Sequence, residues 1–195
     1  MNVEIRRLTP DLAEDYLHFF DHVGFTDHPE WSQCYCLHFH FEDAWDAEDE
    51  GQDNPWRERA ARFVREGKLQ GYLAYADGHV AGWCGANDRE NYHTRLTQRR
   101  ELQDRASRGK RVKSIVCFIV APALRGQGIA TQLLARVCED AAREGYDFLE
   151  AYPARGKVDC YIHHHGPPEL YSKFEFSVHK KRKRDCVMRR DLKGQ

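Results

Sequence analysis

The sequence has no long hydrophobic run and almost no net charge, and both absences exclude classes of protein. No apolar stretch among the 195 residues approaches the ~20 residues that a membrane-spanning helix needs, so we expect no membrane partner. Lysines and arginines number 30 against 31 aspartates and glutamates, which leaves a net charge of −1 and no overall field to attract nucleic acid. The N-terminal stretch MNVEIRRLTP has a strand-like pattern and not that of a signal peptide. We therefore expect a cytoplasmic protein with no nucleic-acid partner.

Repeats, low-complexity segments and a disulfide pattern are lacking as well. The seven cysteines are an odd number, and Cys117 and Cys138 fall inside a predicted strand and a predicted helix, as buried reduced thiols do. Hydrophobic residues make up 41% of the chain, which is enough for one packed core. A chain of 195 residues also fits one compact domain. We predict a single domain over residues 1–195.

Residues 112–152 are the most informative part of the chain. They have the pattern of a buried strand (112–120), a glycine-containing turn (121–128), an amphipathic helix (129–143) and a second strand (148–152). A helix start without bulky side chains exposes unpaired N–H groups at the positive end of the helix dipole. This arrangement suits a phosphorylated ligand.

Two common phosphate-binding motifs fit this turn poorly. A P-loop requires Gly-Lys-Ser/Thr after four spacer residues, and no such run occurs in the sequence. A Rossmann turn would use the GxG of residues 126–128 and Glu150 at the end of the next strand. However, Thr131 occupies the position of the third glycine, and residues 121–125 separate the strand from the first one. The dinucleotide-binding hypothesis is therefore the weaker one.

The turn instead resembles the signature of the GCN5-related N-acetyltransferase (GNAT) superfamily, which is Gln/Arg-x-x-Gly-x-Gly/Ala after a Val-x-Pro strand end. Residues 120–122 are VAP, residues 125–130 are RGQGIA, and residues 170–176 (LYSKFEF) extend the similarity downstream. The resemblance implies an α/β fold with a mixed, mostly antiparallel central sheet flanked by helices. It also implies acetyl-CoA as the acyl donor and an amine as the usual acceptor.

The pattern of the whole chain agrees with that arrangement of elements. An Asp-Gly pair at residues 77 and 78 is a strong hairpin signal. Besides the elements around the turn, we predict strands at 3–8, 70–76, 79–86, 177–179 and 185–190, and helices at 10–22, 55–66 and 168–174.

The resemblance also implies which residues bind the coenzyme. Backbone groups of three strand residues would contact the pantetheine arm and the acetyl carbonyl, and those of the turn and first helical residues would contact the pyrophosphate. In this sequence the first set is Phe118, Ile119 and Val120, and the second is Arg125, Gly126, Gln127, Gly128, Ile129, Ala130 and Thr131. The alternative is an ordinary flexible turn with a solvated arginine.

Tyr171 is the candidate general acid, because residues 170–176 resemble the family pattern Leu-Tyr-x-Lys-x-Gly-Phe, in which the tyrosine protonates the leaving thiolate. A phenol with an ordinary pKa near 10 is protonated at neutral pH, as this role requires. Glu175 replaces the glycine of the pattern, so the local turn is expected to differ. The alternative for Tyr171 is a ring packed in the core with its hydroxyl at the edge.

No residue stands out as the general base. Some family members carry a glutamate at the position that Ser114 occupies here, and a serine has no useful basicity. Glu150, at the end of the next strand, is the candidate with the best position, although a solvated strand-end acid is an equal alternative. Other possibilities are Asp88, Glu90, Asp159 and a chain of water molecules.

Acceptor specificity is expected to come from the irregular segment that follows the first helix. Trp31, Tyr35 and Trp83 would supply an apolar wall for a small-molecule amine. The acidic run at 42–50 would attract a cationic amine or simply form a solvated loop, and a plain solvated turn is favoured for the basic run at 180–184.

Clustered histidines and cysteines raise the alternative of a metal site. Residues 163–165 are three histidines, and residues 34–40 read CYCLHFH. In a straight strand the outer ligands of the second group would lie ~20 Å apart, too far for one zinc ion. A bent loop could bring the four side chains together, but their spacing matches no common zinc-finger pattern. We therefore expect no metal, and these side chains would line or underlie the acceptor pocket.

Together these patterns predict an acetyl-CoA-dependent N-acetyltransferase that acts by direct attack of a primary amine, as a monomer or a homodimer. Cys117 is a poor nucleophile because no partner base is recognisable beside it. The alternatives are a catalytically inactive acyl-CoA-binding regulatory protein and a nucleic-acid-binding module that uses the basic run.

Overall fold

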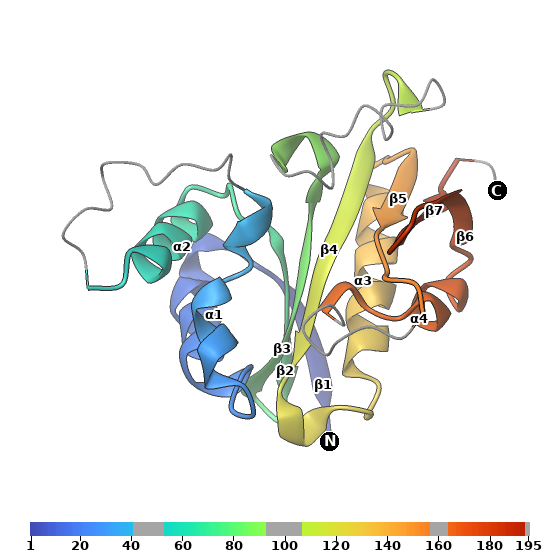
Figure 1. The fold of residues 1–195 in the computed structure, drawn as a ribbon. Coiled ribbons are helices and arrows are strands. Elements are labelled where there is room, and N and C mark those ends of the chain that lie inside the picture. The colour runs from blue at the N-terminus through green and yellow to red at the C-terminus, as the bar shows by residue number, and fades with distance from the viewer. Residues whose placement is uncertain (41–52, 93–106, 157–163, 194–195) are drawn as a thin grey trace.

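The computed structural model describes residues 1–40, 53–92, 107–156 and 164–193, which form one central sheet with helices on both faces (Figure 1). The strands are β1 (Val3–Arg7), β2 (Gly71–Ala76), β3 (His79–Asp88), β4 (Val112–Val120), β5 (Phe148–Ala151), β6 (Ser177–Lys181) and β7 (Cys186–Asp191). The α-helices are α1 (Ala13–His18), α2 (Pro55–Arg65), α3 (Ile129–Arg143) and α4 (Pro168–Ser172). In the described part of the chain, no helix has both the length and the apolar character needed to cross a bilayer.

The sheet has seven strands in the order β1-β2-β3-β4-β5-β7-β6. β4 and β5 pair in parallel, and the other neighbouring strands pair antiparallel. The parallel pair follows from the chain path, because β4 and β5 are joined through α3 and a parallel connection needs such a crossover. The predicted mixed, mostly antiparallel sheet is thus confirmed.

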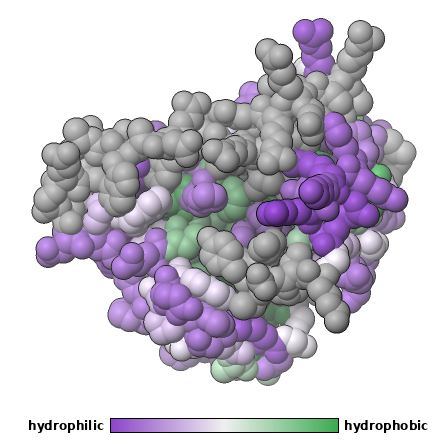
Figure 2. All heavy atoms as spheres, viewed as in Figure 1, coloured by the Kyte–Doolittle hydropathy of each residue, from purple (hydrophilic) through white to green (hydrophobic). Residues whose placement is uncertain are grey.

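Two hydrophobic cores lie on opposite faces of the sheet. Tyr16 and Trp83 belong to the core under α1 and α2, and Leu133 and Tyr171 belong to the core under α3 and α4. β2 is buried at every position, as expected for a strand covered on both sides. Figure 2 shows a group of apolar residues near the centre of the face in view, next to polar residues.

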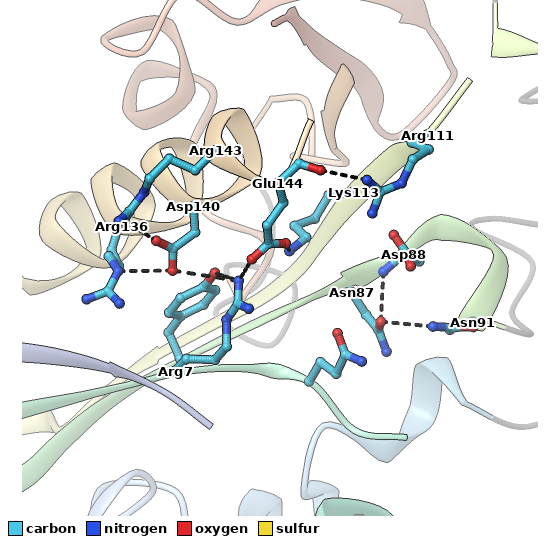
Figure 3. Close-up of polar contacts among 12 residues, drawn as sticks. Arg7, Asn87, Asp88, Asn91, Arg111, Lys113, Arg136, Asp140, Arg143 and Glu144 are labelled. Carbon is cyan, nitrogen blue, oxygen red and sulfur yellow. Dashed lines mark hydrogen bonds and ion pairs between the residues drawn. The ribbon is translucent and has the colours of Figure 1, made fainter. Parts of the chain in front are cut away.

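Ion pairs attach α3 to the sheet and so hold its axis in place (Figure 3). Arg7 of β1 contacts Glu144, just after α3, and the same carboxylate lies 3.0 Å from the buried Lys113 ammonium of β4. Arg136 and Asp140 pair within α3 at 3.0 Å, and the Arg136 side chain also donates to the main chain of β1. These contacts lie in the C-terminal half of α3 and just after it, so they tie that part of the helix to β1 and β4.

A β-bulge divides β4 into two parts. The register with β3 shifts so that Gly85 pairs with Cys117 and Ala86 with Ile115, which leaves Val116 as the extra residue. Pairing with β5 runs only from Val112 to Ile115. A bulge bends its strand and increases the twist, and Figure 1 shows β4 continuing past the end of β5. Residues 117–120 therefore have β3 on one side and an edge without a β5 partner on the other.

The structure differs from the predicted elements in the N-terminal region. The single helix expected at 10–22 is a 3₁₀ turn (Pro10–Leu12), then α1, then a π-helical turn (Phe19–Val23). The π-turn contains Phe19 and Phe20, which are both fully buried. A π-turn adds a residue without interrupting the helix, so apolar spacing alone does not reveal it.

Residues 34–40 do not form a strand, so the geometry used to argue against zinc does not apply to them. They span two 3₁₀ turns, Pro29–Cys34 and Leu37–Phe39, joined by Tyr35 and Cys36 with φ of 40° and 51°. Within the described residues no group of three histidine, cysteine or acidic side chains is arranged to hold a metal ion. His163 and the acidic run at 42–50 lie outside the described residues.

Candidate active site

A cavity of about 950 Å³ lies where the free edge of β4 meets the start of α3, the start of α4 and the N-terminal segment at 25–39. Most of its lining surface is apolar. Because a bulged strand edge and a helix N-terminus face the same space, the cavity offers main-chain hydrogen-bonding groups to a ligand in addition to apolar contacts.

The turn before α3 has the backbone that only glycine adopts easily. Gly126 has φ of 77° and Gly128, which caps α3, has φ of 84°. A Cβ atom at either position would meet no other atom within 4 Å, so the space beside the turn is open. No side chain caps this helix, and the first N–H groups of a helix have no partner within it. The turn therefore fits a pyrophosphate, which would sit at the positive end of the helix dipole.

Arg125 anchors this turn. Its Nε donates to the carbonyl oxygen of Val120 at 3.1 Å, and its guanidinium forms an ion pair with Asp27 of the N-terminal segment. This pairing lowers the pKa of the Asp27 carboxyl. Asp27 was not among the predicted site residues, because nothing in its local pattern indicates a partner 98 residues away.

The predicted coenzyme-binding residues meet at this cavity. All of them line it except Gln127, whose side chain donates to the carbonyl oxygen of Ala123. Those at the free edge of β4 are Phe118, Ile119 and Val120, and those at the turn are Arg125, Gly126, Gly128, Ile129, Ala130 and Thr131. The structure thus brings the strand and turn residues together around one space.

Comparison with known proteins agrees with this geometry. The profile of the acetyltransferase (GNAT) family matches residues 30–166, well over half of the chain. The chain belongs to the GNAT family. A search of curated proteins finds no match.

Solved structures with the same fold include several acetyltransferases. One is an N-acetyltransferase from Staphylococcus aureus Mu50, 18% identical with a TM-score of 0.55, covering 99% of this chain and 100% of that chain. Another is the PaiA N-acetyltransferase from Thermoplasma acidophilum in complex with coenzyme A, 14% identical, TM-score 0.55, covering 98% and 99%. A third is the putative acetyltransferase YncA from Salmonella typhimurium with its cofactor acetyl-CoA, 18% identical, TM-score 0.52, covering 99% and 95%. At these identities the likeness shows a GNAT fold.

Tyr171, the tyrosine of the GNAT pattern, is buried directly behind the cavity wall. Its hydroxyl donates to the carbonyl oxygen of His165 at 2.5 Å, and a Cβ added to the lining residue Gly166 would lie 3.2 Å from it. Burial raises the pKa of Tyr171 well above its ordinary value, so the phenol keeps its proton at neutral pH. The hydroxyl would have to leave the His165 carbonyl to reach a leaving thiolate, and its role as the acid stays a prediction.

Glu175 keeps the left-handed backbone of the glycine that it replaces in the GNAT pattern. Its φ is 62°, and its carboxylate pairs with Arg190 at 3.1 Å. The turn that was expected to differ therefore has a backbone conformation that glycine favours, at a cost of roughly 1–2 kcal/mol for a residue with a Cβ.

Glu150 does not face the cavity, contrary to expectation. Its side chain is fully enclosed, and Arg189 lies 2.5 Å and Arg89 3.3 Å from its oxygens. Tyr152 also donates to Glu150, at 3.2 Å, and lies 2.8 Å from the hydroxyl of Ser114 on β4. The carboxylate thus balances the charge of two arginines inside the sheet and has no direct access to the cavity. Its role as the general base stays a prediction. Neither arginine was expected beside it, since both pairings are long-range.

Of the three predicted acceptor residues, only Trp31 lines the cavity. Trp83 is fully buried against Tyr16 and Phe20. Tyr35 is buried, and its hydroxyl donates to Asp21 at 2.5 Å. Both side chains therefore pack in the core. Aromatic rings surround Trp83, whose indole N–H has no hydrogen-bond partner among the described residues, and the Asp21 carboxylate accepts from Tyr35.

His165 is a lining residue with an unusual environment. Its Nδ1 lies 2.8 Å from the carbonyl oxygen of Val116, the bulge residue, and a carbonyl can only accept, so Nδ1 carries a hydrogen. Burial lowers the pKa of His165 to about 3. At neutral pH the ring is therefore uncharged, and it holds the bulge from the side where β5 is missing.

The low pKa of His165 makes stability fall in mild acid. The unfolded histidine binds a proton near pH 6.5, whereas the folded one does so only near pH 3. The contribution of His165 to the free energy of unfolding is therefore complete above pH 6.5 and is lost as the pH falls toward 3. Between pH 7.0 and 5.0 the wild type should lose about 2 kcal/mol more unfolding free energy than His165→Asn, which retains an N–H donor. Urea denaturation at both pH values measures this difference, and equal losses would contradict the buried neutral ring.

Proposed function

We propose that the protein transfers the acetyl group of acetyl-CoA to a primary amine of a small molecule. The observation that carries this proposal is the open glycine turn at the start of α3 beside the edge of β4 that lacks a β5 partner. Together they offer main-chain groups for a pyrophosphate at one end and for a thioester carbonyl at the other. Membership of the GNAT family supports the same reaction.

In the proposed mechanism the amine attacks the thioester directly. A bond forms between the amine nitrogen and the carbonyl carbon, the carbon–sulfur bond breaks, and the amine gives up a proton to solvent. The departing thiolate receives the phenolic proton of Tyr171, which is replaced from solvent. Main-chain N–H groups along residues 117–120 of β4 would orient the carbonyl.

The environment of Cys117 argues against a covalent acyl-enzyme. This cysteine lines the cavity, but a hydrogen bond with Cys36 and burial raise the pKa of its thiol well above the ordinary value. The thiol is therefore protonated at neutral pH, and the thiol form is a poor nucleophile.

One observation favours the alternative of a coenzyme-binding protein without turnover. Ser114 occupies the position of the glutamate base of some GNAT members, and its hydroxyl is engaged with Tyr152. Thiol release from acetyl-CoA in the presence of a panel of amines separates the two functions. Binding of acetyl-CoA by calorimetry without any amine-dependent release would establish the inactive form, and no binding at all would contradict both.

Replacing the proposed acid should slow turnover without weakening coenzyme binding. In Tyr171→Phe the ring and its core contacts remain, but no proton is available for the thiolate, so we expect kcat to fall roughly 10- to 100-fold. The dissociation constant of acetyl-CoA should stay within about twofold, measured by calorimetry. Tyr146→Phe, which removes a hydroxyl outside the cavity lining, is the matched control and should retain full activity. Wild-type kcat in Tyr171→Phe would overturn the assignment.

A further inference from the structure

His165 is hydrogen-bonded to two separate parts of the proposed reaction centre. Its ring reaches the bulge of β4, where Nδ1 donates to the carbonyl oxygen of Val116 at 2.8 Å. Its main-chain carbonyl oxygen accepts the hydroxyl of Tyr171 at 2.5 Å. One residue of the segment before α4 is therefore bonded both to the strand that would present the acyl group and to the proposed acid.

The bond from the ring satisfies a carbonyl at the point where β4 loses its β5 neighbour. Val116 is fully buried, and the pairing of β4 with β5 ends one residue earlier, at Ile115. A buried carbonyl oxygen needs a hydrogen-bond partner, and His165 provides one. Because a strand bends at a bulge, a donor fixed to the bulge carbonyl restrains the direction of the main chain that follows, residues 117–120.

Gly166 allows this segment to lie close to both β4 and α4. A Cβ built there would lie 3.2 Å from the Tyr171 hydroxyl and 3.4 Å from the ring of Phe118 on β4. Its φ of 73° is a left-handed conformation that glycine adopts without steric cost. The chain at 165–166 thus contacts the strand on one side and the tyrosine on the other.

The ring of His165 is suited to holding this geometry and not to accepting a proton from the amine. Burial lowers its pKa to about 3, and the neighbouring His164 and His38 lower it further. At neutral pH the ring is therefore uncharged, with its hydrogen on Nδ1. The rings of His164 and Phe39 lie 4.1 Å and 5.8 Å from it, centroid to centroid, and restrict its orientation.

We propose that His165 is a positioning residue for acyl transfer. Its ring holds the bulge so that the main chain of residues 117–120 meets the thioester carbonyl, and its carbonyl oxygen holds the Tyr171 hydroxyl nearby until the thiolate forms. This inference rests on the acetyltransferase function proposed above. Hydrogen-bond donors that are in place beforehand stabilise developing charge without reorganising during the reaction, and a misplacement of ~1 Å can cost about 100-fold in rate.

The thioester carbonyl of bound 13C-labelled acetyl-CoA measures this positioning without any turnover. A hydrogen bond lowers the infrared stretching frequency of a carbonyl, so we expect a shift to lower frequency in the wild-type complex. His165→Phe keeps a ring but has no N–H donor and should lose the shift, and His165→Leu serves the same purpose if the phenyl ring does not fit. His165→Asn retains an N–H donor and should restore most of the shift. The dissociation constant of free coenzyme A should stay within about threefold in every variant, because the turn before α3 is unchanged.

Turnover provides a second measurement. The assay is thiol release from saturating acetyl-CoA with the fastest acceptor among tyramine, spermidine, an aniline and a lysine-containing peptide. In His165→Phe we expect kcat to fall at least about tenfold while the KM for acetyl-CoA changes less than about threefold, and His165→Asn should recover most of the wild-type kcat. His22→Phe, which replaces an exposed histidine outside the cavity lining, is the control for loss of an imidazole and should match the wild type.

The outcomes separate this role from the proposed function. A wild-type carbonyl shift or a wild-type kcat in folded His165→Phe would overturn the positioning role and leave the acetyltransferase function standing. Equal losses in His165→Asn and His165→Phe would also overturn it, because the hydrogen bond would then make no difference. If the wild type binds acetyl-CoA but transfers to none of the four amines, the proposed function fails and the infrared shift alone decides the role of His165. No shift in the wild type would contradict that role.

Discussion

Gly128→Val should abolish measurable acetyl-CoA binding. The φ of 84° costs a residue with a Cβ roughly 1–2 kcal/mol of folding stability whether or not the coenzyme is bound. The new side chain would also fill the open space beside the turn and keep a pyrophosphate away from its main-chain N–H groups. Each charge-assisted hydrogen bond that is lost costs ~1.5–3 kcal/mol of binding free energy. The loss of two such bonds corresponds to roughly 100- to 10,000-fold weaker binding, which isothermal titration calorimetry would register as little or no heat at micromolar protein.

Gly67→Val is the matched control for this variant. Gly67 follows α2, has φ of 67° and has no atom within 4 Å of a built Cβ, so the backbone strain is similar. It does not line the cavity. Both variants should therefore lose comparable stability in urea denaturation, and only Gly128→Val should lose coenzyme binding. Normal binding by a folded Gly128→Val protein would contradict the role of the turn, and with it the proposed function.

Glu150→Leu should be the most destabilising single substitution at the sheet centre. The substitution removes the carboxylate that pairs with the Arg189 guanidinium, whose side chain is only 9% exposed. Removing one member of a buried ion pair costs about 3–5 kcal/mol, because the remaining charge is uncompensated. Equilibrium denaturation in urea measures the loss.

A second substitution separates a structural role of Glu150 from a catalytic one. Glu150→Leu combined with Arg189→Met removes the carboxylate together with the closer of its two arginines, so it should recover part of the lost stability, while Arg89 stays beside the new leucine. If Glu150 acts only through the fold, the folded double variant should retain kcat within about threefold. Recovered stability with a kcat at least 100-fold below wild type would instead support Glu150 as the base.

The parts of the structure that the sequence predicted are those governed by short-range patterns. The strand, glycine turn and helix at 112–143 appear with the predicted bounds, because apolar periodicity and the conformations of glycine act within a few residues. The hairpin at 77–78 has left-handed φ at both turn residues, 48° and 85°, as an Asp-Gly turn requires. The meeting of turn and strand at one cavity followed from the same local motif.

The errors come from contacts between residues far apart in the chain. Glu150 was expected at the cleft because it lies near the end of β5, but Arg189 is 39 residues away and no local pattern indicates their pairing. Trp83 was expected in an acceptor wall, but it is buried against the rings of Tyr16 on α1 and Phe20 in the π-turn that follows. An aromatic residue has the same local signature in a core and in a pocket, so only the tertiary structure distinguishes them.

The extra residue in β4 has a consequence for solubility. A strand edge with free N–H and C=O groups normally invites a second chain to add a strand, and long exposed edges promote aggregation. Here the stretch after Val116, which has no β5 partner, lines a cavity, and the ring of His165 donates to the bulge carbonyl. A ligand can reach this edge through the cavity, whereas an added strand would have to displace His165 from the Val116 carbonyl.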